Sequence, residues 1–178
     1  MIAQFGEQPA LALDNFIALN QRVQPGHIRV DADEVSYPLH VILRYEIERA
    51  LVEGEIEVDD IPTLWAEKMQ QYLGIDTRGD NRNGCMQDIH WTDGSFGYFP
   101  TYTLGAMYAA QLFHAARQAV PGLEAAIAAG NLQTLSAWLK DNVWQHGSRF
   151  STAELITRAT GGTLNPSFFR KHLEARYL

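Results

Sequence analysis

Most of this sequence is divided into stretches whose apolar residues recur every three to four positions, with proline near the start or glycine at the end. That spacing places apolar side chains on one face of an α-helix, where proline favours the first turn and glycine the end. Residues 59–74, DDIPTLWAEKMQQYLG, have the full pattern, with Asp59 or Asp60 as cap, Pro62 in the first turn and Gly74 as stop. The pattern predicts an all-α fold with at most a very small β element.

The remaining stretches predict further helices joined by loops. Residues 99–118 are apolar almost all round, which is typical of a helix at the centre of a protein. Residues 28–33 alternate apolar and charged side chains and predict a short extended segment, and residues 55–58 predict a very short strand. No clear boundary divides residues 1–178, which are predicted to be a single helical domain. The other predicted helices are residues 10–21, 39–54, 123–130, 132–147, 151–162 and 165–178.

Composition and charge narrow the class of partner. The 178 residues carry 14 Lys and Arg against 21 Asp and Glu, a formal net charge of −7. This charge argues against nucleic acid or an anionic membrane surface as the main partner. No apolar run reaches the roughly 18 residues of a membrane span, and the N-terminus has no signal-peptide pattern. A cytoplasmic protein is therefore expected, and its single cysteine, Cys85, excludes an internal disulfide.

Polar and aromatic residues are concentrated just before the long apolar stretch. Asp88 or Gln87 could fix the tautomer of His90, leaving its other ring nitrogen for a ligand. Tyr98 and Tyr102 are four positions apart, so on a helix they share one face. Two phenols beside a histidine can donate hydrogen bonds to an oxyanion or a carboxylate. The alternative is that both tyrosines are core aromatic residues with satisfied hydroxyl groups.

Arg29 lies in the predicted extended segment, and its planar guanidinium suits a carboxylate ligand. The alternative is an internal salt bridge with Asp31, Asp33 or Glu34. No pair of histidines has the spacing of a zinc-binding helix, and no cysteine cluster, Gly-rich phosphate loop or nucleophile elbow occurs. No metal-ligating residues are therefore predicted.

Two short stretches match motifs of a known family. GCMQDIHW at residues 84–91 matches Gly-x-x-Gln-Asp-x-His-Trp, and IRVDAD at residues 28–33 matches Ile-Arg-x-x-Ala-Asp. Both resemble the carboxypeptidase Taq family, zinc metallocarboxypeptidases that remove single C-terminal residues from peptides. Residues 33–51 and 94–111 resemble long helices of that family. The resemblance implies a zincin-like, almost all-helical fold around a deep groove, with peptide C-termini as substrates.

The resemblance also implies roles for individual residues. Arg29 would hold the C-terminal carboxylate of the peptide, because a bidentate arginine recognises that group well. The implied substrate-binding residues are Arg29, Asp33, Gln87 and Asp88, and among them Asp33 and Gln87 would support the others. The implied catalytic residues, similar to an arrangement in angiotensin-converting enzyme that stabilises the tetrahedral oxyanion, are His90, Tyr98 and Tyr102.

The zinc of this family is held by a His-Glu-x-x-His helix and by a Glu of a later motif, both before the Ile-Arg-x-x-Ala-Asp segment. Only 27 residues precede Ile28, and neither motif is present. The chain is therefore expected to be the C-terminal, substrate-binding half of a metallocarboxypeptidase, binding no zinc and inactive by itself. The alternative is a non-catalytic helical module that self-associates, since a half-enzyme exposes apolar surface. A homodimer is expected in either case.

Overall fold

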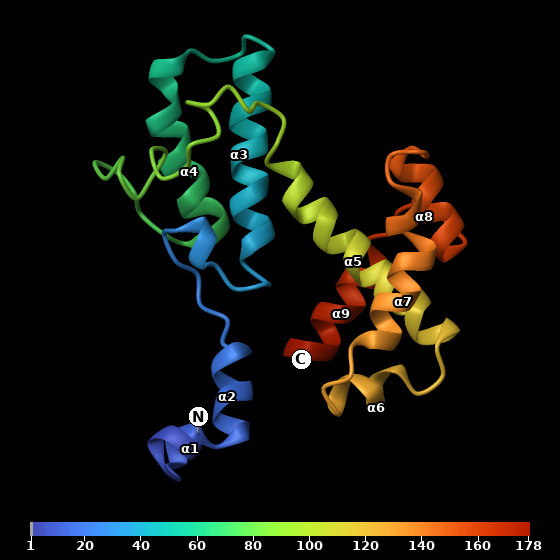
Figure 1. Cartoon of the computed structure of the whole chain (residues 1–178). Coiled ribbons are helices and arrows are strands. Elements are labelled where there is room, and N and C mark those ends of the chain that lie inside the picture. The colour runs from blue at the N-terminus through green and yellow to red at the C-terminus, as the bar shows by residue number, and fades with distance from the viewer. Residues whose placement is uncertain (1) are drawn as a thin grey trace. The chain divides into compact units, whose positions relative to one another are not determined.

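A computed structural model describes residues 2–178 as helices joined by loops, with no strand in that range (Figure 1). The predicted all-α fold is confirmed. The elements, with η marking a 3-10 helix, are α1 (Ile2–Phe5), η1 (Pro9–Leu11), α2 (Leu13–Asn20), η2 (Arg29–Asp31), α3 (Tyr37–Val52), η3 (Val58–Asp60), α4 (Ile61–Leu73), α5 (Pro100–Ala119), α6 (Leu123–Ala128), α7 (Gln133–Asn142), η4 (Trp144–His146), α8 (Thr152–Thr160) and α9 (Ser167–Tyr177).

The predictions of an extended segment at residues 28–33 and of a short strand at residues 55–58 are wrong. Arg29–Asp31 forms the 3-10 turn η2, and residues 55–58 lead into the 3-10 turn η3. An isolated extended segment has no neighbouring strand to pair its backbone groups, whereas a 3-10 turn pairs them locally. Alternating side chains alone therefore did not identify a strand here.

The chain divides into two compact units, with the boundary inside α5. Unit 1 runs to Thr103 and includes Tyr177, and unit 2 runs from Leu104 to Arg176 and includes Leu178. The single domain over residues 1–178 stays a prediction. The residues singled out by sequence analysis all lie in unit 1.

In unit 1, α3 and α4 lie side by side (Figure 1). α4 has the predicted proline in its first turn, and Gly74 ends it in the left-handed region at φ 70°. Asp60 does not cap α4 with its side chain, because its carboxylate accepts the backbone N–H of Glu57 in the preceding turn. The buried apolar core between the helices is Leu43, Ile47, Trp65, Met69 and Leu73.

Unit 2 contains the rest of α5, helices α6 to α8, and α9 apart from Tyr177. Along α5 only Gln111 and Ala116 are buried, so the prediction of a central, enclosed helix is wrong. A helix that is apolar all round needs neighbours all round, and most α5 side chains remain half-buried or exposed. Gln111 bonds to Thr160 Oγ1 and accepts the N–H of Asn165, which fixes the loop between α8 and α9. No helix within residues 2–178 is long and apolar enough to cross a membrane.

Candidate functional site

Two buried arginines share one carboxylate in unit 1. Nε and Nη2 of Arg29 both donate to Oδ1 of Asp88, at 3.0 and 2.7 Å, and Nε of Arg44 donates to Oδ2 at 2.6 Å. The three side chains are 6%, 0% and 10% exposed in the order Arg29, Arg44 and Asp88. Arg29 therefore pairs with an acid 59 positions away rather than with Asp31 or Asp33. Two cations and one anion leave this buried group with one positive charge in excess.

The charged forms of these three groups persist at neutral pH. Burial by itself would raise the pKa of Asp88, but the hydrogen bond from Arg29 and the charge of Arg44 lower it below the ordinary value. Burial lowers the pKa of Arg44 to about 10, even with Asp88 beside it. Burial also opposes the charge of Arg29, yet the contact with Asp88 raises its pKa above the usual value. The excess positive charge is therefore present under physiological conditions.

Arg29 keeps part of its hydrogen-bonding capacity. Nη1 donates to the hydroxyl oxygen of Tyr37 at 2.7 Å, and the guanidinium lies 4.9 Å from the ring centre of Tyr102. A guanidinium has five N–H groups, and three of them donate to Asp88 and Tyr37. Two N–H groups are left that could meet a ligand, which fits recognition of a planar carboxylate.

His90 and the two tyrosines come together beside this ion pair. Nε2 of His90 lies 2.9 Å from the hydroxyl oxygen of Tyr102, and its ring packs on Phe99 at 4.3 Å between centres. Nδ1 of His90 is buried without a hydrogen-bond partner among the described residues, 4.0 Å from Oδ1 of Asp88. Asp88 therefore lies near Nδ1 of His90, as expected, but is too far away to fix the tautomer of the ring by a normal hydrogen bond.

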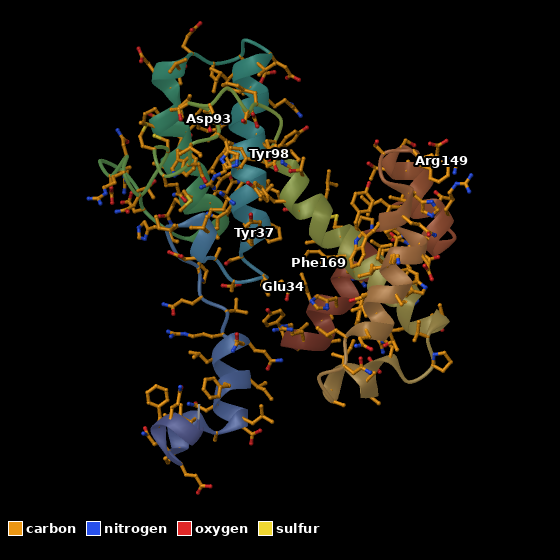
Figure 2. All side chains as sticks on the ribbon, viewed as in Figure 1. Glu34, Tyr37, Asp93, Tyr98, Arg149 and Phe169 are labelled. Carbon is orange, nitrogen blue, oxygen red and sulfur yellow. The ribbon has the colours of Figure 1, made fainter. Side chains whose placement is uncertain are left out.

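Tyr98 lies just before α5 rather than on it, so the predicted shared helical face is wrong. Its ring centre is 5.3 Å from that of Tyr102 and 5.7 Å from that of His90. Half of the Tyr98 side chain is exposed, and Figure 2 shows it where the loop leads into the helix. The two tyrosine rings are therefore brought together by the turn before α5, and not by a spacing of four along the helix.

Gln87 and Asp33 bond to backbone groups. Oε1 of Gln87 accepts the N–H of Arg29, and Nε2 donates to the carbonyl oxygen of His27, which ties η2 to the loop. The Asp33 carboxylate accepts hydrogen bonds from the backbone of Gln24, Val35 and Ser36 and from the Ser36 hydroxyl. These bonds lower the pKa of Asp33 although burial opposes the charge. Both residues thus hold the backbone of the segment that carries Arg29. Gln87 makes no hydrogen bond to His90 among the described residues, although the sequence suggested one.

Sequence analysis missed a row of buried polar residues on α3. His40, Arg44 and Glu48 are spaced by four, so they share one helical face beside the apolar core. Glu48 accepts the backbone N–H of Gly97 and thereby holds the turn that precedes Tyr98. The spacing of four between these three polar residues could have predicted a shared buried face. Only the apolar positions of this helix were used in the sequence-based prediction.

Glycines allow the loop to pass close to α4 and to turn sharply. A Cβ at Gly84 would lie 2.8 Å from the carbonyl oxygen of Asp80, so a larger residue would force the backbone apart. Gly94 and Gly97 have φ of 71° and 81°, a region that other residues rarely adopt. The loop geometry at the site therefore depends on these glycines.

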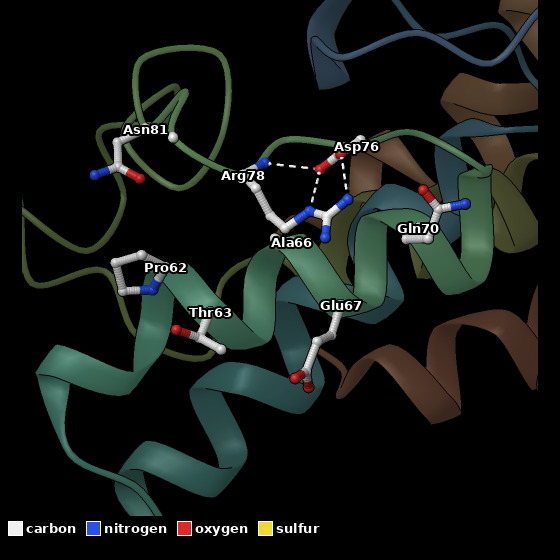
Figure 3. Close-up of a pocket in the computed structure, with 9 residues that line it drawn as sticks. Pro62, Thr63, Ala66, Glu67, Gln70, Asp76, Arg78 and Asn81 are labelled. Atoms are coloured by element: carbon white, nitrogen blue, oxygen red, sulfur yellow. Dashed lines mark hydrogen bonds and ion pairs between the residues drawn. The ribbon is translucent and has the colours of Figure 1, made fainter.

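A pocket of about 520 Å³ lies beside α4, and its lining contains none of the residues described above (Figure 3). In it Asp76 and Arg78 form an exposed two-pronged ion pair. Hydrogen bonds from Arg78 lower the pKa of Asp76 to about 2. The exposed ion pair of Asp76 and Arg78 can therefore serve as a control for the buried ion pair of Arg29 and Asp88.

Solved structures of metallocarboxypeptidases match the chain along almost its whole length. Metallocarboxypeptidase 1 of Trypanosoma cruzi has a TM-score of 0.94 and 51% identity, over 99% of this chain and 37% of that one. The M32 carboxypeptidase of Deinococcus radiodurans R1 has a TM-score of 0.93 and 38% identity, over 99% and 36%. The fold is therefore the one found in this part of these metallocarboxypeptidases.

The chain belongs to the carboxypeptidase Taq (M32) metallopeptidase family, whose model matches residues 1–177. Carboxypeptidase 1 of Bacillus subtilis is 42% identical over 167 residues, which are 94% of this chain and 33% of that protein. The chain thus spans about a third of the length of the curated relatives it matches. The resemblance seen in the two sequence motifs is confirmed.

The side chains that the structure describes do not fit a zinc site. Within residues 2–178, no three His, Cys, Asp or Glu side chains lie where they could hold a metal ion. A zinc ion in a protein needs at least three such ligands, so no chemical step at this site is assigned to zinc.

Proposed function

We propose that this chain supplies the substrate-binding part of a zinc metallocarboxypeptidase and holds the C-terminal carboxylate of a peptide. The observation that carries the proposal is the buried group of Arg29, Arg44 and Asp88, with one positive charge in excess. An uncompensated buried charge is costly, and a bound anion offsets that cost. The two remaining N–H groups of Arg29 suit a carboxylate, and a terminal carboxylate distinguishes the end of a peptide from its interior.

A second role is proposed at the carbonyl group of the scissile peptide bond, for His90, Tyr98 and Tyr102. When Nε2 of His90 carries the proton, it donates to the hydroxyl oxygen of Tyr102 and leaves the phenol proton for an oxyanion. The exposed side chain of Tyr98 lies next to it and can provide a second phenol. Asp33, Gln87 and Asp88 support the substrate-binding residue Arg29 without requiring contact with the peptide.

The 178-residue chain by itself is proposed to bind no zinc stoichiometrically and to hydrolyse no peptide. The zinc of a complete enzyme of this kind would have to be bound by residues outside the range 2–178. Metal analysis of the purified chain tests this statement, and one tightly bound zinc per chain would contradict it. A cytoplasmic location belongs to the same proposal.

The proposal predicts selection between a peptide acid and its amide. We expect the chain to bind an N-acetylated dipeptide at least about tenfold more tightly as the free acid than as the C-terminal amide, a difference of about 1.4 kcal/mol. Arg29→Gln should abolish this preference, because it removes the charge and the two-pronged donor. NMR titration of the acid and the amide provides the measurement.

Arg78→Gln is the matched control, since Arg78 is an exposed arginine paired with Asp76 outside the site. It should leave the preference unchanged. Equal affinity of the unsubstituted chain for acid and amide would count against the proposed function.

The second candidate is a non-catalytic helical module that self-associates as a homodimer. Apolar side chains are exposed around a groove of about 570 Å³ in unit 1, and such patches favour association. The exposed members are Val58, Met86, Ile89 and Phe96.

Mixing the chain with the N-terminal part of a family member separates the two candidates. Restored carboxypeptidase activity supports the enzyme part. A stable dimer in sedimentation with no restored activity favours the self-associating module.

A further inference from the structure

We propose that Arg44 is a positioning residue that orients Arg29 through Asp88. Arg44 bonds to Asp88 on the opposite carboxylate oxygen from Arg29, and it also donates to a backbone carbonyl rather than to His90 or a site tyrosine. The inference rests on the proposed function for what Arg29 binds. The orientation of Arg29 itself can be measured without any ligand.

Arg44 is the most firmly held member of the group. Its side chain is fully buried, and Nη1 donates to the carbonyl oxygen of His40 one turn earlier in α3, at 2.7 Å. The guanidinium lies over the ring of Trp65, at 4.4 Å from its centre, and at 5.5 Å from that of Phe99. Nη2 of Arg44 has no hydrogen-bond partner among the described residues, so the hydrogen bonds of Nε and Nη1 and the two aromatic rings are what restrict the orientation of this guanidinium.

Asp88 has no comparable support from its own backbone. It lies in the irregular loop between α4 and α5, outside any helix. The 2.6 Å bond from Nε of Arg44 occupies Oδ2, and therefore the carboxylate presents Oδ1 to Arg29. The rigid helix α3 thus sets the orientation of a carboxylate on a loop.

Arg29 depends on that carboxylate for its plane. It lies in the three-residue turn η2, and Oδ1 of Asp88 accepts both Nε and Nη2 along one edge of the guanidinium. Fixing this edge directs the Nη1 side toward Tyr37 and lays the guanidinium near the ring of Tyr102. The order of support runs from Arg44 to Asp88 to Arg29.

A purely electrostatic role for Arg44 makes a different prediction. If only its charge mattered, lysine would replace it, because an ammonium group paired with Asp88 carries the same charge. Positioning instead requires the planar fork, which lysine lacks. Arg44→Lys is therefore the decisive variant, and Arg44→Met is the second variant without charge.

The test follows hydrogen exchange of the Arg29 Nε–H group in the 178-residue chain by ¹⁵N NMR at neutral pH. We expect at least tenfold faster exchange in both Arg44→Lys and Arg44→Met than in the unsubstituted chain. Arg49→Lys, an exposed arginine on the same helix, is the matched control and should leave the rate unchanged. Backbone amides of α4 report general loss of stability in the same spectra.

Faster exchange confined to Arg29 supports the proposal. Unchanged exchange of Arg29 in Arg44→Lys overturns it, and so does an equal rise at the α4 amides in that variant. Loss of the acid-over-amide preference in Arg44→Lys, with the α4 amides unaffected, supports the link to binding. A chain that never prefers the acid contradicts the proposed function, while the exchange of Arg29 still decides the role of Arg44.

Discussion

Asp88→Asn is expected to lower the free energy of unfolding by about 3–5 kcal/mol at pH 7, the range for breaking a buried ion pair by removing one partner. The asparagine keeps the size of the side chain but leaves Arg29 and Arg44 without a counter-ion. Both arginines are almost fully buried, so water cannot replace the lost carboxylate. Urea denaturation followed by circular dichroism and tryptophan fluorescence gives the difference directly.

The matched control is Asp76→Asn, which removes the exposed partner of Arg78. Because solvent screens that pair, little change in stability is expected. Equal losses in the two variants would mean that burial does not set the strength of the Asp88 interaction.

The same argument predicts a pH dependence. The folded-state pKa of Asp88 is below the ordinary value of 3.8, so its stabilisation is complete above that value and is lost as the pH falls through the folded pKa. The difference between the unsubstituted chain and Asp88→Asn should therefore shrink below about pH 4. A difference that stays constant to lower pH would contradict this assignment.

Acidification from pH 7 to pH 4 is expected to cost about 3 kcal/mol of stability through His40 alone. Burial first, and the nearby charge of Arg44 second, lower the pKa of His40 from 6.5 to about 4. In the unfolded chain the imidazole takes up a proton near pH 6.5, whereas the folded chain resists protonation until about pH 4. Stability therefore falls as the pH drops through this window, in which the unfolded state binds more protons.

His40→Leu should remove this slope while changing stability little at pH 7. Neither ring nitrogen of His40 has a hydrogen-bond partner of normal geometry among the described residues, and leucine has a similar volume. His27→Leu, at an exposed position, should retain the slope. Urea midpoints between pH 4 and pH 7 make the comparison, and an unchanged slope in His40→Leu would refute the prediction.

Local patterns predicted the helices because helix periodicity and end signals act over a few residues. Pro62 and Gly74 delimit α4 as expected. The helix expected from residue 151 is present as α8, and Ser151 and Glu154 form a capping box at its start. The same local approach failed at η2, where alternation of side chains did not reveal that strand partners are missing. Burial of α5 also could not be predicted, since it depends on which other segments surround that helix.

The candidate site was only partly predictable. The sequence motifs identified Arg29, Asp88 and His90, which the fold brings together. They did not reveal that Gln87 and Asp33 bond to the protein backbone. A polar side chain that contacts substrate and one that bonds to backbone look the same in the sequence. Arg44 and Glu48 were missed because charged residues on a helix are usually solvent-exposed.

The sequence by itself determined an all-helical chain of a known metallopeptidase family, since helix signals are local and the two family motifs are contiguous. Only the tertiary structure decided which charges share Asp88, because its partners lie 44 and 59 positions away along the chain. An ion pair requires contact within about 4 Å together with loss of water, and neither condition can be deduced from spacing along the chain. The buried positive charge that supports the proposed carboxylate site is therefore a property of the folded chain.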